Sequence, residues 1–142
     1  FHPRGPWAYV INELDSTVTA YRFDADSGAL DPFQVLPTLP DDFTGRSRAA
    51  EIEIARNGRT LYASNRGFDG IAVFRIDEAS GRLHFVEAVE TAGRTPRFFA
   101  IAPGGQILFA LNEDSDSIAA FAIDNDCGRL RPAGRPLVAC GS

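Results

Sequence analysis

The sequence predicts an all-β protein in which one unit of antiparallel strands is repeated, and this expectation rests on an internal repeat. Equivalent residues recur at steps of 53 and then 47 residues along the 142-residue chain. The matching sets are Asn12, Asn65 and Asn112; Tyr21, Phe74 and Phe121; and the turn segments 27–30, 80–83 and 127–130. A fixed period of this size with strand-like contents is typical of a β-propeller or a similar array. The sequence shows no segment of useful length with the helical period.

The first copy of the repeat gives the order of its strands. Residues 1–5 match the end of a strand that runs into a glycine-containing turn in the other copies, so we expect the chain to begin within a strand. The runs 7–11, 18–23 and 30–36 are short and rich in β-branched or aromatic residues, and a turn at 24–28 separates the last two. These features indicate antiparallel strands joined by tight turns.

The second copy spans about 49–92 and the third about 96–139, and each contains four such runs. With the first copy at about 1–40, the sequence predicts a β-propeller fragment of about three four-stranded antiparallel blades, with residues 1–142 in a single domain. The inserted loop 37–48 accounts for the longer first step of the repeat. Because propellers typically close with about four to eight blades, we expect a longer parent chain.

The ends of the chain support the same expectation. The sequence opens at Phe1 and contains no methionine, so we expect the natural N-terminus to lie upstream. A fragment of a propeller exposes one blade face at each end. We therefore expect these faces to contact the missing blades of the parent chain or a second copy.

Composition argues against several classes of partner. The net charge is −5, which disfavours nucleic acid, and no apolar run approaches the length of a membrane span. No cluster of histidine, cysteine and carboxylate residues has metal-ligand spacing, so we expect neither a metal nor another cofactor. Cys127 lies in a turn and Cys140 at the far end of the next strand, too far apart for a disulfide. Two free thiols favour a cytoplasmic location.

Strand order gathers the variable positions on one rim. If strands A to D run from the innermost to the outermost, the B–C loops and the D–A links share this rim. The position after the repeated asparagine is Glu13, Arg66 and Glu113 in successive copies. The two D–A links carry arginines: Arg46 and Arg48 in one, Arg94 and Arg97 in the other. Carboxylates and guanidinium groups therefore converge at one mouth of the channel, where ligands bind in such folds.

Two carboxylates also depart from the repeat on the expected innermost strand. Glu51 and Glu53 stand where the third copy has Phe98 and Ala100. Because an unpaired buried charge is costly, at least one of the two should meet Arg66, Arg97 or solvent. The opposite interpretation stays open, since acid–arginine pairs between blades can be purely structural. The repeated asparagines can likewise serve only to satisfy backbone groups at strand ends.

Four segments carry a family resemblance: 10–18 (VINELDSTV), 49–52 (AAEI), 64–67 (SNRG) and 94–98 (RTPRF). They resemble the later blades of the seven-bladed β-propeller lactonase family, which includes cytosolic 6-phosphogluconolactonases and carboxy-muconate lactonising enzymes. The likeness covers nearly the whole chain. It implies that Glu13 matches the family's proposed active-site glutamate and Arg66 its later arginine. It also implies that the family's histidine and another arginine lie upstream of Phe1.

The residue types suit opening of an anionic sugar lactone such as 6-phosphogluconolactone. A carboxylate can activate water as a base, and a guanidinium can stabilise the oxyanion or hold a phosphate or carboxylate. We assign catalytic roles to Glu13, Arg66 and Glu51, and substrate-binding roles to Arg97, Arg94, Asn12 and Asn65. Two alternatives remain: a carboxy-cis,cis-muconate cyclase, which runs related chemistry in the other direction, and a propeller that binds a ligand or protein without catalysis.

Overall fold

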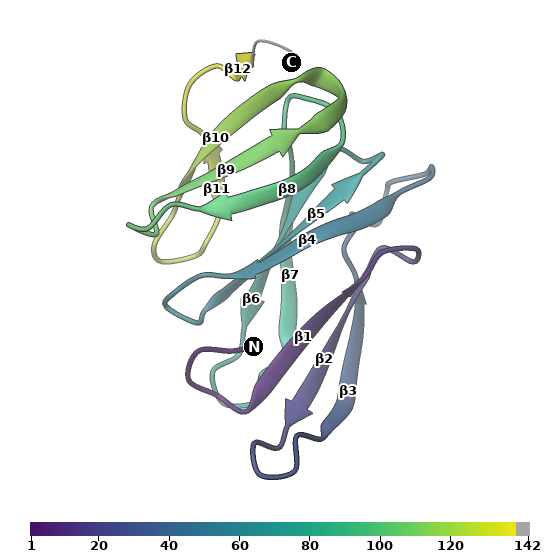
Figure 1. The fold of residues 1–142 in the computed structure, drawn as a ribbon, viewed down its shortest axis with the longest axis vertical. Coiled ribbons are helices and arrows are strands. Elements are labelled where there is room, and N and C mark those ends of the chain that lie inside the picture. The colour runs from purple at the N-terminus through teal and green to yellow at the C-terminus, as the bar shows by residue number, and fades with distance from the viewer. Residues whose placement is uncertain (139–142) are drawn as a thin grey trace.

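The computed structural model describes residues 1–138 and consists of three antiparallel sheets that follow one another in chain order (Figure 1). The first sheet contains β1 (Trp7–Asn12), β2 (Thr17–Phe23) and β3 (Leu30–Pro37). The second contains β4 (Arg48–Ile54), β5 (Thr60–Arg66), β6 (Gly70–Ile76) and β7 (Leu83–Glu90). The third contains β8 (Pro96–Ile101), β9 (Ile107–Asn112), β10 (Ser117–Ile123), β11 (Leu130–Pro132) and β12 (Leu137–Val138), with a short 3₁₀ helix, η1 (Glu113–Ser115), between β9 and β10.

In each sheet consecutive strands pair antiparallel, except that β12 of the third sheet pairs with β10, and this all-antiparallel arrangement confirms the predicted fold class. Strands β1, β5 and β9 hold equivalent places in the repeat, and β4 and β8 form the inner edges of the second and third sheets. Strand β4 packs against both β1 and β8, so successive sheets meet through the edge strands in the middle of the molecule (Figure 1). This is the arrangement of adjacent blades around a channel.

The first sheet has three strands among the described residues, where we expected four. Residues 1–5 form the glycine-containing turn that the repeat predicted: the His2 amide donates to the Trp7 carbonyl oxygen at 2.8 Å, the bond that closes the same turn from Ala55 and from Ala102 in the other copies. The His2 ring then joins two sheets: its Nδ1 accepts from the Gly5 amide at 2.8 Å, and its Nε2 lies 2.8 Å from the Gly58 carbonyl oxygen. Since Nδ1 accepts, the proton resides on Nε2.

The fourth strand of the third sheet is divided in two, which also differs from the expected blade. Strand β11 pairs with one end of β10 and β12 with the other. The interruption falls at 133–136, where Gly134 has φ 100° and Pro136 has no amide to donate to β10. Residue 139, the last of the expected third copy, and Cys140 lie outside the described residues, so the expectation about the cysteines stays open.

Two hydrophobic clusters lie on the two sides of the second sheet. Leu61, Ala63 and Phe74 belong to the cluster shared with the first sheet, whereas Tyr62 and Val73 belong to the cluster shared with the third. Successive residues of β5 and β6 therefore pack against different neighbours, as strand geometry requires. The alternation explains why β5 and β6 are buried on both faces.

Two tyrosine hydroxyls connect neighbouring sheets. The Tyr9 hydroxyl donates to the Gly81 carbonyl oxygen at 2.8 Å, and Tyr62, 53 residues later, donates to the Gly128 carbonyl oxygen at 2.7 Å. Burial raises the pKa of both phenols, so they remain protonated donors. A glycine is required at position 81, because its φ is +73° and a Cβ there would lie 2.5 Å from the Trp7 ring.

Candidate functional site

The rim on which carboxylates and guanidinium groups were predicted to converge contains a direct ion pair between two sheets. Glu13 follows β1 and Arg66 ends β5, and the Arg66 Nη2 donates to the Glu13 Oε1 at 2.6 Å. The Arg66 side chain is 21% exposed and that of Glu13 is 55% exposed. The pair therefore lies at the surface, with the Arg66 side chain mostly buried and that of Glu13 open to solvent. The two residues occupy the same position in adjacent copies of the repeat, which is why equivalent loops bring them together.

The guanidinium groups around Glu13 change its acidity. The hydrogen bond from Arg66, then the charge of Arg66, and to a smaller extent the charges of Arg48 and Arg97 lower the pKa of Glu13. The Arg48 Nη1 lies 4.0 Å from the Glu13 Oε1. Glu13 is therefore an ionised carboxylate near neutral pH, surrounded by three positive charges.

A pocket of about 320 Å³ lies beside this pair, lined by Ile11, Glu13, Ala49, Ala50, Arg66 and Arg97. Both inner strands are irregular here: the β4–β5 register shifts between Ala49 and Ile52, and the β8–β9 register shifts between Pro96 and Phe98. Such bulges redirect side chains at the end of a strand. Ala50 and Arg97 hold equivalent positions, so the small residue leaves room that the arginine of the next sheet borders.

Arg66 is fixed mainly through one of its nitrogens. Its Nη2 also donates to the Ala49 carbonyl oxygen at 3.2 Å, whereas its buried Nε has no hydrogen-bond partner among the described residues. Arg97 lies on the other side of the pocket, with its Nη1 3.4 Å from the Glu113 Oε2. Two guanidinium groups thus face one small polar pocket, which suits an anion or a carbonyl oxygen that develops negative charge.

The carboxylates of the inner strand lie farther along β4. The Glu51 Oε1 accepts from the Ile52 amide at 2.9 Å, and Glu51 does not line the pocket beside Glu13. The Glu53 Oε2 accepts from the Ile101 amide of β8 at 3.0 Å, and both side chains are half-buried. Neither carboxylate is dry and unpaired, which confirms that part of the expectation, although neither forms an ion pair with Arg66 or Arg97 among the described residues.

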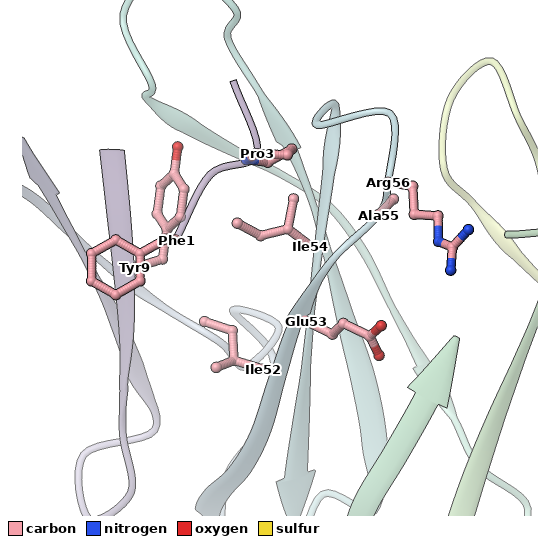
Figure 2. Close-up of a pocket in the computed structure, with 8 residues that line it drawn as sticks. All are labelled: Phe1, Pro3, Tyr9, Ile52, Glu53, Ile54, Ala55 and Arg56. Atoms are coloured by element: carbon pink, nitrogen blue, oxygen red, sulfur yellow. The ribbon is translucent and has the colours of Figure 1, made fainter. Parts of the chain in front are cut away.

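Glu53 has an acid–base property that the sequence did not reveal. Burial, with a smaller contribution from the charge of Glu51, raises the pKa of Glu53 against the lowering effect of the Ile101 amide. Its replacement by Ala100 in the next copy was the only sequence signal. Glu53 lines a different pocket, of about 370 Å³, between β1 and β4. Figure 2 shows its carboxylate on the side of β4 away from Tyr9 and Phe1, so it belongs to the contact with β8.

The other predicted substrate-binding residues have structural contacts. The Asn65 side chain is fully buried, its Oδ1 accepts from the Thr38 hydroxyl at 2.7 Å and its Nδ2 donates to the Thr38 carbonyl oxygen at 2.7 Å. Asn12 donates to two threonine hydroxyls of β2, both at 2.9 Å. Arg94 donates to the Asp114 carbonyl oxygen at 3.0 Å and so holds η1. None of the three lines the pocket beside Glu13.

Comparison with known proteins identifies the family. The family profile described as "Lactonase, 7-bladed beta-propeller" matches residues 1–141. The chain belongs to this family. Its sheets are therefore part of a propeller, as the repeat indicated.

Similar proteins agree with this assignment. The chain is 43% identical over 103 residues to the 6-phosphogluconolactonase of Bacillus subtilis, an alignment that covers 72% of this chain and 30% of that protein. A crystal structure of a Lactobacillus plantarum protein matches 98% of this chain and 40% of its own, with a TM-score of 0.94 and 30% identity. The periplasmic gluconolactonase PpgL of Pseudomonas aeruginosa matches 98% of this chain and 38% of its own, with a TM-score of 0.90 and 32% identity.

These matches also show what share of the relatives' length the chain covers. It spans about 30% of the length of the curated relatives it matches. The described residues contain no group of three or more histidine, cysteine or acidic side chains placed to hold a metal ion. Within residues 1–138, no helix has the length and apolar character needed to cross a bilayer.

Proposed function

We propose that the full-length protein hydrolyses an anionic sugar lactone such as 6-phosphogluconolactone, with Glu13 and Arg66 facing the substrate. The observation that carries this proposal is the 2.6 Å ion pair between equivalent loops of adjacent blades, beside a pocket bordered by Arg97. Family membership and the similarity to a 6-phosphogluconolactonase support the same reaction class. We also propose the cytoplasm as its location, because the exposed Cys127 has no disulfide partner within residues 1–138.

The reaction requires a nucleophile, a base and a site for negative charge. Water attacks the lactone carbonyl carbon, the carbonyl oxygen becomes an oxyanion, and the bond from that carbon to the ring oxygen then breaks. Arg66 and Arg97 are suited to stabilise the oxyanion, since both border one pocket. Glu13 accepts the proton of the attacking water and returns it to the departing ring oxygen, which becomes a hydroxyl group of the sugar acid.

The ion pair imposes a condition on this mechanism. A carboxylate whose pKa is lowered by Arg66 is a weak base in the resting site. An oxyanion or phosphate that attracts Arg66 weakens its hold on Glu13 and so increases the basicity of the carboxylate. Substrate binding therefore activates Glu13, whereas Arg48 and Arg97, the lesser contributors, keep it ionised.

A substrate panel tests the proposal on the full-length protein that contains this chain. Initial rates are measured with 6-phosphogluconolactone, gluconolactone and carboxy-cis,cis-muconate, after subtraction of the uncatalysed rate. We expect the highest kcat/KM with the phosphorylated lactone. Turnover of the muconate alone would identify a cyclase instead, and no turnover of any of the three, with intact fold by circular dichroism, would contradict an enzymatic role in this chemistry.

A further inference from the structure

The inserted loop between β3 and β4 forms a second pocket on the same rim as Glu13. We propose that this pocket is a subsite for the phosphate of the substrate; the assignment rests on the proposed lactonase function. The pocket has a volume of about 590 Å³ and is bordered by the loop after β1 and by the loop 38–47. The residues that carry the proposal are Asp15, Ser16, Arg46, Ser47 and Arg48.

The second pocket adjoins the first, because successive residues of the chain line the two pockets and a charged contact connects them. Glu13 lines the smaller pocket and the next three residues, 14–16, line the larger one. Arg48 lines the larger pocket and lies 4.0 Å from the Glu13 Oε1. A ligand whose reacting carbonyl lies beside Glu13 and Arg66 can therefore extend an anionic group past Arg48 into the larger pocket.

Several contacts fix the inserted loop in place. The Thr38 amide donates to the Ser16 carbonyl oxygen at 2.8 Å, and the Thr38 hydroxyl, which donates to the buried Asn65, lies 2.8 Å from the same carbonyl oxygen. The Ser47 hydroxyl donates to the Arg66 carbonyl oxygen at 3.0 Å. Phe43 packs edge-on against Phe68 with ring centroids 5.4 Å apart. Because both ends and the middle are held, Arg46 and Arg48 project from an ordered segment, which reduces the entropic cost of binding.

A glycine on the neighbouring loop permits this close packing. Gly67 has φ +94°, and a Cβ at this position would lie 2.2 Å from the Arg46 carbonyl oxygen. The loop carrying Arg46 therefore rests directly on the turn that follows Arg66. This contact couples the position of the second pocket to that of the ion pair.

The polar groups of the second pocket favour a multiply charged anion. Arg46 forms no ion pair among the described residues, and the exposed Arg48 only reaches Glu13 at 4.0 Å. Ser16 is 2% exposed and its hydroxyl has no partner in the described part of the chain. Asp15 is the one carboxylate that lines this pocket within the described residues, so two guanidinium groups exceed it by one charge. A phosphate dianion gains more from that excess than an uncharged hydroxymethyl group does.

The equivalent link between the second and third sheets does not offer the same groups. It is six residues shorter, as the steps of 53 and 47 show. Its Arg94 already donates to the Asp114 carbonyl oxygen. Both links carry two arginines, but Arg94 and Arg97 contact Asp114 and Glu113, whereas Arg46 forms no ion pair among the described residues. This difference indicates a role of the inserted loop in specificity rather than in the repeat itself.

The test compares Arg46→Gln with Arg22→Gln in the full-length protein. Arg22 is an exposed arginine of β2 toward the opposite rim, with no ion pair among the described residues, so it controls for the loss of one positive charge. For Arg46→Gln, we expect KM for 6-phosphogluconolactone to rise roughly tenfold while KM for gluconolactone and kcat for both stay unchanged. Arg22→Gln should change none of these values. An equal effect of Arg46→Gln on both lactones, or no effect, would overturn the subsite.

Calorimetry separates this inference from the proposed function. The wild-type protein should bind 6-phosphogluconate more tightly than gluconate, and Arg46→Gln should remove most of that difference, with the double variant Arg46→Gln/Arg48→Gln removing the rest. If the wild type hydrolyses neither lactone, the lactonase proposal fails and the same titration still decides the subsite. Equal affinity for the two sugar acids in the wild type would refute a phosphate subsite.

Discussion

Replacing Arg66 by alanine tests the proposed site through the Glu13 carboxylate. The Arg66 side chain donates two hydrogen bonds to the protein, to Glu13 at 2.6 Å and to Ala49 at 3.2 Å, and both come from Nη2. The Arg66 Nη1 therefore has no protein partner among the described residues. A charge-assisted contact from this group to the oxyanion contributes about 1.5–3 kcal/mol. The variant should therefore lose roughly ten- to a hundredfold in kcat/KM near neutral pH.

The pH profile of Arg66→Ala provides a second, independent readout. Arg66 is the largest cause of the lowered pKa of Glu13, and the ionised carboxylate is the active base. In the wild type, kcat/KM should fall only as the pH drops through this lowered pKa. Without Arg66 the pKa returns toward the ordinary glutamate value of about 4.3, so the acid limb moves to higher pH and the relative loss grows below about pH 5.

Initial rates with the phosphorylated lactone between acid and neutral pH measure both effects. Arg97→Ala is the matched control, because Arg97 is the smallest of the three cationic contributors to the pKa of Glu13 and should shift the limb least. Glu13→Gln should abolish the limb and lower kcat more than it changes KM. An acid limb that stays in place in Arg66→Ala, with the fold intact by circular dichroism, would show that Glu13 is not the titrating base.

Three further predictions concern the framework of the chain. Asn65→Ala should destabilise the protein by about 1–3 kcal/mol in urea titrations, because it leaves buried groups of Thr38 without partners; an unchanged midpoint would contradict this structural role of Asn65. Hydrogen bonds from the serine of its turn and from two backbone amides lower the pKa of Asp77, so its contribution to stability should be lost as the pH falls through that lowered value. Asp77→Asn should therefore flatten the acid limb of thermal stability, and parallel wild-type and variant curves would refute this. Cys127→Ser should raise the melting temperature slightly, because Ser27 and Ser80, at the equivalent positions, donate their hydroxyls to the aspartates of their turns, and a decrease would argue against this contact at Asp124.

The repeat made most of the fold predictable. Strand positions, antiparallel pairing and the shared rim all followed from the recurrence of the asparagine and aromatic positions at steps of 53 and 47. Two details did not follow, because they depend on contacts absent from a repeat comparison. The contact of the His2 ring with Gly58 of the second sheet has no counterpart in the other copies, which have alanine at this position. The break in the last strand depends on Pro136, which the repeat comparison did not single out.

The candidate site was predictable only in part. The position after the repeated asparagine changes from glutamate to arginine between the first two copies. This change predicted that Glu13 and Arg66 lie close together, because equivalent loops of adjacent sheets meet at one rim. Sequence alone could not separate the residues that face the pocket from those that hold the sheets together. Asn65 is buried against Thr38, a partner 27 residues away, and only the packing of the link on β5 shows this. The inserted loop was recognised as extra sequence, but its pocket depends on the approach of Arg46 to Gly67.

The arrangement of charges around the rim has a consequence for ligand binding. Arg66 is paired with Glu13. The charge of Arg97 lowers the pKa of Glu13, and its Nη1 lies 3.4 Å from the Glu113 carboxylate. An anionic ligand must therefore compete with carboxylates for both guanidinium groups. Acid that protonates Glu13 releases Arg66, so below about pH 5, where the phosphate of the product is already a monoanion, product binding should strengthen as the pH falls, even while catalysis that needs ionised Glu13 declines. Opposite pH trends for the affinity of 6-phosphogluconate and for kcat are the signature of such a competition, and parallel trends would mean that the ligand does not displace the ion pairs.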